Sequence, residues 1–245
     1  MERRGFLKLS GTTAAAIVVA PSLITETLRA EDGSMYKSYG KIMLKDKDGN
    51  PLKTANLVKE ENYVFHYPYV ATTNILVDLG EATKTNVKLK AEDGTEYTFK
   101  GGVGAKGSVV AFSTICPHAF SHVSQGTSFF KYVESTGKTA AYTSGGVFVC
   151  SSHLSAFDPK EGGRGVNGPV KGKQNLAEIV LEVDKDDVIW AVGVLGQDKF
   201  IEYFDSYKDE FKKYYGNKRK AKKLLKGDDT EVKTLKNFST DIIAF

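Results

Sequence analysis

Two short stretches of the chain each combine a cysteine with a histidine. The first is Cys116-Pro117-His118 and the second is Cys150-Ser151-Ser152-His153. Together they contain both cysteines of the 245-residue sequence and two of its four histidines. Two thiolates and two imidazoles can complete a zinc site, or bind a [2Fe–2S] cluster in which two histidines replace two cysteines on one iron. The pattern C-x-H…C-x-x-H therefore predicts a metal centre.

The spacing of the ligands favours the iron–sulfur cluster. Zinc sites commonly pair like with like, as C-x-x-C and H-x-x-x-H. Here each stretch supplies one cysteine and one histidine, which suits a two-iron cluster because each loop then sends one ligand to each iron. We expect Cys116, His118, Cys150 and His153 to hold a Rieske [2Fe–2S] cluster, with a structural zinc site as the alternative.

A β framework is expected to position these ligands. Short apolar runs alternate with turn sequences such as Asp48-Gly49-Asn50 and Asp93-Gly94. The expected strands are residues 63–67, 74–79, 96–99, 108–112, 146–149, 177–183 and 188–194. The runs 108–112 and 146–149 lead directly into the two ligand stretches. The pattern predicts an all-β antiparallel sandwich or small barrel over residues 42–196, preceded by a polar linker over 31–41.

The N-terminal 30 residues have the layout of an export signal. Arg3-Arg4 precedes Gly5-Phe6-Leu7-Lys8, and an apolar stretch follows over about residues 12–24. This resembles a twin-arginine signal, a route that carries folded proteins across the membrane. We expect residues 1–30 to be such a signal or a membrane anchor, and the protein to be periplasmic. Residues 6–24 would cross a bilayer only marginally.

A longer set of motifs surrounds the ligands. These are Phe65-His66-Tyr67-Pro68, Val109-Val110-Ala111-Phe112-Ser113, Gly146-Val147-Phe148-Val149-Cys150 and His153-Leu154-Ser155-Ala156-Phe157-Asp158-Pro159. Over about residues 60–196 the chain resembles the small Rieske subunit of the arsenite oxidase family. The resemblance implies a Rieske fold, in which an antiparallel β-sandwich base carries a smaller [2Fe–2S] cluster-binding subdomain. It also implies that Cys116 and Cys150 hold the buried iron, and that His118 and His153 hold the outer iron.

The resemblance gives meaning to four neighbouring residues. Ser155 matches the serine that donates a hydrogen bond to a bridging sulfide, and Phe157 stands where many Rieske proteins carry a tyrosine. Ser121 and Ser152 align with positions that many Rieske proteins join by a disulfide. The missing tyrosine and disulfide predict a potential in the lower or middle part of the family range of about −150 to +300 mV.

The function implied by the resemblance is electron transfer. The chain would relay electrons between a large molybdopterin/iron–sulfur subunit and a soluble carrier such as cytochrome c. It would have no substrate-converting centre of its own, and electrons could flow in reverse, as in relatives that reduce iodate. The alternative is the Rieske subunit of a quinol–cytochrome c reductase, which the missing disulfide and tyrosine disfavour. A Rieske oxygenase needs two more histidines and a carboxylate, and only His66 and His122 remain.

Two segments depart from the family pattern. The interval 119–149 is longer than in family members, and its runs 128–133 and 139–142 predict an added β-hairpin. In residues 197–245, aromatic side chains recur near helical spacing up to Gly216, and a basic run covers 218–226. We expect a helical, basic extension, whose basic run either contacts anionic lipid or an acidic protein or is a solvated basic helix. The net charge of +4 is too small to indicate nucleic acid binding.

Overall fold

The computed structural model describes residues 35–243. The expected signal or anchor over 1–30, the first residues of the expected linker, and residues 244–245 lie outside this range. Among the residues described, no helix has both the length and the apolar character needed to span a membrane.

Eight strands of the described chain form the main sheet, in the order β14–β1–β13–β12–β6–β3–β2–β15. Their bounds are β1 (Tyr36–Lys45), β2 (Tyr63–His66), β3 (Thr73–Asp78), β6 (Val109–Ser113), β12 (Glu178–Val183), β13 (Ile189–Leu195), β14 (Asp229–Glu231) and β15 (Lys233–Thr234). Neighbouring strands are antiparallel except β1 and β14. Both faces of β3 are covered, because Leu76 packs into one core and Ile75 and Val77 pack into the other.

A smaller sheet carries the second ligand stretch. Its order is β11–β10–β9–β8. The bounds are β8 (Phe130–Val133), β9 (Val147–Cys150), β10 (Ser155–Asp158) and β11 (Arg164–Asn167). The remaining pairs are the hairpin β4 (Val87–Lys90) with β5 (Glu96–Phe99), and the parallel pair β7 (Thr127–Ser128) with β16 (Asp241–Ile242). Three single 3₁₀ turns are η1 (Thr54–Asn56), η2 (Pro159–Glu161) and η3 (Gly168–Val170). The strands expected from the sequence are all present, within one or two residues at their ends.

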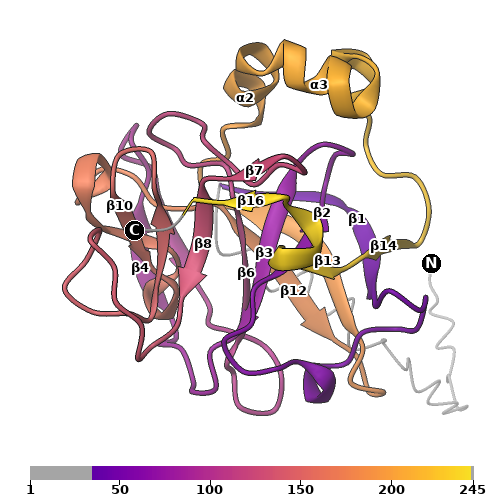
Figure 1. Ribbon diagram of the computed structural model, residues 1–245. Helices are drawn as coiled ribbons and strands as arrows, with labels where there is room; N and C mark the ends of the chain where they lie inside the picture. The colour runs from indigo at the N-terminus through magenta and orange to yellow at the C-terminus, as the bar shows by residue number, and fades with distance from the viewer. Residues whose placement is uncertain (1–34, 244–245) are drawn as a thin grey trace, which may run out of the picture.

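The C-terminal extension is only partly helical. Its helices are α2 (Phe200–Ser206), α3 (Lys208–Tyr215), α4 (Lys218–Ala221) and α5 (Leu235–Phe238), and α2 and α3 lie together at the top of the view in Figure 1. Gly216 follows α3 with a φ of +82°, as a helix-ending glycine commonly does. The expectation of a purely helical tail is wrong, because β14, β15 and β16 return to the body and pair with β1, β2 and β7.

The expected linker over 31–41 also needs correction. Residues 36–41 belong to β1, which pairs with β13 from Tyr36 opposite Leu195. The polar, glycine-containing sequence concealed the strand because its register shifts near Gly40, whose φ is +93°. The ladder to β13 supplies the hydrogen bonds that this stretch needs, so the strand forms although several of its side chains are exposed.

The expected hairpin within 119–149 has a different second strand. Residues 130–133 form β8 as expected, but β8 pairs with β9. Residues 139–142 contribute only a single bridge between Thr139 and Tyr142. Pairing with β9 lets the ring of Tyr132 pack edge-on against Phe148 at 5.5 Å, which buries two aromatic side chains together.

Candidate metal centre

The second ligand stretch occupies the tip of the β9–β10 hairpin. Cys150 ends β9 and lies opposite Ser155, which begins β10. The four residues between them form the turn and include His153. Leu154 adopts a φ of +52°, which allows the chain to reverse over this short distance. The hairpin thus fixes Cys150 in a strand and presents His153 at the tip.

The first ligand stretch follows β6 and forms a compact turn of its own. The Phe120 N–H donates to the Cys116 carbonyl oxygen at 2.8 Å, and the Cys116 N–H donates to the Ser121 carbonyl oxygen at 2.9 Å. Phe120 has a φ of +60°, so the turn is left-handed at that point. His118 lies inside this closed turn, which restricts where its side chain can point.

The four predicted ligands come together as two pairs. Cys116 and Cys150 are each 1% exposed, and their thiols interact through a hydrogen bond. The imidazoles of His118 and His153 are exposed, with ring centroids 4.8 Å apart and planes at 89°. An inner thiol pair and an outer imidazole pair are what a [2Fe–2S] cluster with two cysteine and two histidine ligands requires.

The thiol pair differs from two separate cysteines in its acidity. The hydrogen bond from Cys116 lowers the pKa of Cys150 to about 7, although burial opposes this. The same hydrogen bond raises the pKa of Cys116, and burial raises it further. Cys150 therefore loses its proton easily, whereas Cys116 keeps its proton. Cys116 can become a thiolate as well only when a positive charge neutralises the pair. Bound iron ions would supply that charge.

Hydrogen-bond donors surround the sulfur atoms. The backbone N–H groups of His118 and Ala119 interact with Cys116, and those of Ser152 and His153 interact with Cys150. The fully buried Ser155 hydroxyl has no hydrogen-bond partner within residues 35–243. A buried hydroxyl normally has one, so its orientation suits an acceptor supplied by a bound group. The donor set therefore fits a [2Fe–2S] cluster with Ser155 as an outer hydrogen-bond donor.

The two other positions singled out in the sequence lie beside the ligands. Phe157 is fully buried on β10 and packs against Phe130 with ring centroids 6.1 Å apart. The Ser152 hydroxyl donates to the Ser121 hydroxyl at 2.7 Å, so a hydrogen bond joins the two ligand loops. Gly168 of η3 packs against the tip of the β9–β10 hairpin. A Cβ at position 168 would come within 2.7 Å of the Leu154 carbonyl oxygen, so this close packing requires glycine.

Sequence reasoning missed a group of residues from the C-terminal extension. His122 is buried just after the first ligand loop, where its Nε2 donates to the Glu210 carboxylate at 2.8 Å. The rings of Tyr203 and Tyr207 flank it. The aromatic spacing indicated a helix at this place in the chain, but no local signal paired that helix with His122.

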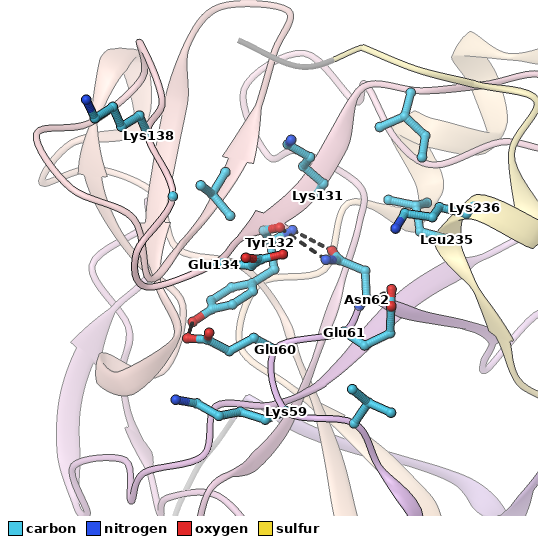
Figure 2. A pocket seen from close by; sticks show the side chains of 14 residues that line it. Lys59, Glu60, Glu61, Asn62, Lys131, Tyr132, Glu134, Lys138, Leu235 and Lys236 are labelled. Carbon is cyan, nitrogen blue, oxygen red and sulfur yellow. Dashed lines mark hydrogen bonds between the residues drawn. The ribbon is translucent and has the colours of Figure 1, made fainter.

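A cavity of about 480 Å³ lies apart from the ligands. Figure 2 shows Asn62 at its wall, with its side-chain amide donating to the Tyr132 carbonyl oxygen at 3.1 Å and accepting from the Tyr132 N–H at 2.6 Å. The Tyr132 hydroxyl points toward the Glu60 carboxylate, 3.4 Å away. None of the predicted ligands lines the cavity.

Comparison with known proteins agrees with this geometry. Residues 78–182 match the family model described as the Rieske [2Fe-2S] domain. The chain is 30% identical over 211 residues to the iodate reductase subunit IdrB of Pseudomonas sp. (strain SCT), covering 85% of each sequence. It is 34% identical over 198 residues to the iodate reductase subunit IdrB of Denitromonas iodatirespirans, covering 80% of this chain and 82% of that protein.

A similar solved structure is the soluble domain of the Rieske protein II (soxF) from Sulfolobus acidocaldarius. The sequence identity is 25% and the TM-score is 0.39, over 61% of this chain and 86% of the other.

Proposed function

Because the chain belongs to the Rieske [2Fe–2S] family, we propose that it is the electron-transfer subunit of a periplasmic molybdopterin oxidoreductase of the arsenite oxidase type. Its relatives are subunits of iodate reductases, which supports an oxidoreductase assembly with a larger catalytic subunit. The chain would pass electrons between that subunit and a soluble carrier such as cytochrome c.

The observation that carries the proposal is the arrangement of the ligands as a buried cysteine pair and an exposed histidine pair. When bound, the cluster takes up and releases a single electron. The buried Cys116 and Cys150 would hold it away from water, and the Ser155 hydroxyl would donate a hydrogen bond to it. His118 and His153 form the outer edge, which a partner can approach closely. The chain is thus organised for electron relay, with chemistry on the substrate assigned to the large subunit.

The proposed terminal substrate is an oxyanion bound by the large subunit. The relatives named as iodate reductase subunits favour reduction of such an anion, with electrons arriving from the soluble carrier. Arsenite oxidation would use the same chain with the opposite direction of flow. The twin-arginine layout of Arg3-Arg4 and the apolar stretch after it support export in the folded state.

The test is to purify the full chain from cells that produce it, under conditions that keep complexes intact. A co-purifying large subunit that contains molybdenum is expected, and dithionite reduction should give a Rieske-type EPR signal. Adding iodate should then reoxidise the cluster only when the large subunit is present. Co-purification of a cytochrome b instead would contradict the proposal and favour a quinol–cytochrome c reductase.

A further inference from the structure

The first ligand loop has a tether to the C-terminal helices. His122 lies four residues beyond the ligand His118, and only 4% of its surface is exposed. Its Nε2 lies 2.8 Å from Glu210 Oε1 on α3, and its Nδ1 lies 3.1 Å from the Phe120 carbonyl oxygen. Each ring nitrogen therefore faces an oxygen atom that accepts hydrogen bonds. The ring is therefore held on two sides.

Two tyrosines of the extension enclose the remaining surface of this ring. Tyr203 and Tyr207 meet it edge-on, with ring centroids 4.7 Å and 4.5 Å away. Tyr203 is itself fixed, because its hydroxyl donates to the Ala71 carbonyl oxygen at 2.9 Å and its ring packs against Phe211 at 5.1 Å. The helices that hold His122 are thus anchored to the β body near the start of β3.

The backbone beside His122 carries this restraint into both ligand loops. The preceding residue, Ser121, accepts the Cys116 N–H through its carbonyl oxygen and the Ser152 hydroxyl through its own hydroxyl. One contact closes the turn that contains His118, and the other reaches the β9–β10 hairpin. A displacement of the His122 ring would therefore disturb the first ligand turn directly.

A second route leads from His122 to the cysteine of the other loop. The Phe129 N–H donates to the His122 carbonyl oxygen at 3.2 Å. The Phe129 carbonyl oxygen in turn accepts the Ser151 N–H at 2.8 Å and the Ser151 hydroxyl at 3.1 Å. Ser151 follows Cys150 directly, so the position of His122 bears on both cysteine ligands.

We propose that His122 is a positioning residue for the [2Fe–2S] centre, and that Tyr203, Tyr207 and Glu210 form a tail clamp that holds it. Between the two ligand loops, Ser121 and Ser152 provide only a hydrogen bond. The tail clamp adds a restraint that a covalent link would otherwise supply. The C-terminal extension is on this account part of the metal centre, although it contributes no ligand.

The test uses the full chain with its cluster bound. His122→Phe keeps a ring between the two tyrosines but removes both nitrogen atoms. A hydrogen bond to a charged group contributes enough free energy to change a rate by about tenfold. We expect the visible absorbance of the cluster to decay about tenfold faster in the presence of a chelator, and the EPR spectrum of the reduced protein to shift. His122→Gln, whose amide can still donate to Glu210, should recover most of the wild-type behaviour.

Glu210→Ala removes the partner of His122 on α3 and therefore tests the same hydrogen bond. It also keeps the proposal testable if His122→Phe does not fold. Its matched control is Asp209→Ala, which removes the same charge from the adjacent, exposed residue of α3. Faster cluster loss and a shifted EPR spectrum with Glu210→Ala but not with Asp209→Ala would support the tail clamp. Wild-type spectra and decay within about twofold of wild type in Glu210→Ala would overturn it, as would equal effects in both variants.

Discussion

The Ser152 hydroxyl donates a 2.7 Å hydrogen bond to the Ser121 hydroxyl, and this bond joins the two loops that carry the predicted metal ligands. The two serines are 31 residues apart in the chain. By resemblance to other Rieske proteins, they occupy positions where a disulfide often links the loops. A hydrogen bond contributes about 1 kcal/mol to stability and a disulfide several times more. The loops of this protein therefore depend more on the surrounding structure.

Replacing both serines, as Ser121→Cys with Ser152→Cys, should create a disulfide between the loops. Closing a loop of this length corresponds to at most about 4 kcal/mol in the chain-entropy model, and less where the fold already restrains the loops. We expect a higher unfolding temperature under oxidising conditions. Mass spectrometry should confirm the disulfide as the loss of two hydrogen atoms, whose electrons pass to the added oxidant. Each single variant is a control. An unchanged unfolding temperature in a fully oxidised double variant would contradict the expectation.

The Ser155 hydroxyl is expected to raise the reduction potential, because a donor to the cluster sulfur stabilises the more negative, reduced state. Ser155→Ala should lower the midpoint potential on the order of 60 mV, the one-electron equivalent of about 1.4 kcal/mol. Protein-film voltammetry measures this shift. Ser108→Ala is the matched control, because the buried Ser108 hydroxyl already donates to the Asp78 carboxylate at 2.5 Å. Equal shifts in the two variants would contradict a specific role for Ser155.

Phe157→Tyr should have the opposite effect on the potential. Phe157 is buried on β10, the strand that begins opposite Cys150, and by resemblance its position is that of a tyrosine that donates to a ligand cysteine. The added hydroxyl is expected to raise the midpoint potential on the order of 60 mV. A lower or unchanged potential in a variant with wild-type thermal stability would show that the hydroxyl does not reach the sulfur.

Much of the framework was predictable because strand signals are local. The run 96–99 is β5, and 146–149 leads into Cys150 at the end of β9. The pairing of the four expected ligands was also predictable, since each cysteine has its histidine within three residues. The surprises are contacts between distant segments. β15, at Lys233–Thr234, completes the main sheet by pairing with β2, and no pattern in its two residues indicates this.

The role of His122 illustrates the same limit at the metal centre. Its sequence neighbours contain no motif, and its partner Glu210 lies 88 residues further along the chain. The His122 ring is buried because α2 and α3 fold back over the first ligand loop. This is a tertiary contact, and the local sequence around His122 does not indicate it. Sequence spacing indicated which residues are expected to bind the metal, while the contacts that hold the loops in place became visible only in the assembled structure.

His66 should make stability depend on pH. Burial lowers the pKa of this histidine to about 4 from 6.5, and Lys233 adds to the effect. Its Nδ1 is buried without a hydrogen bond to any residue of the described range 35–243, and the ring packs against Phe238. Because the folded state has the lower pKa, the unfolded state takes up a proton first as the pH falls. Stability is therefore full above about pH 6.5 and declines toward about pH 4.

The loss attributable to His66 is about 2.5 kcal/mol at about pH 4.5. His66→Phe keeps an aromatic ring beside Phe238 but has no group that titrates in this range. The variant should therefore not show this part of the stability loss at acid pH. Urea unfolding at about pH 7 and about pH 4.5 should show a smaller acid loss in the variant, and comparing the two proteins removes contributions that both share. If the free energy of unfolding fell equally in the wild type and in His66→Phe, a group other than His66 would be responsible for the acid sensitivity.

Leu154 is expected to contact the partner subunit, because it is 36% exposed at the hairpin tip between the ligand His153 and Ser155. Burying a leucine side chain contributes about 1.5–3 kcal/mol, so Leu154→Asn should weaken binding of the large subunit by about tenfold or more. Leu154 has a φ of +52°, a conformation that asparagine adopts more readily than leucine. The variant should therefore bind more weakly without losing stability, which separates docking from folding.

Val58→Asn, at a 62% exposed position remote from the ligands, is the control and should bind normally. Isothermal titration calorimetry measures the affinity, and unchanged binding by Leu154→Asn would remove the hairpin tip from the interface.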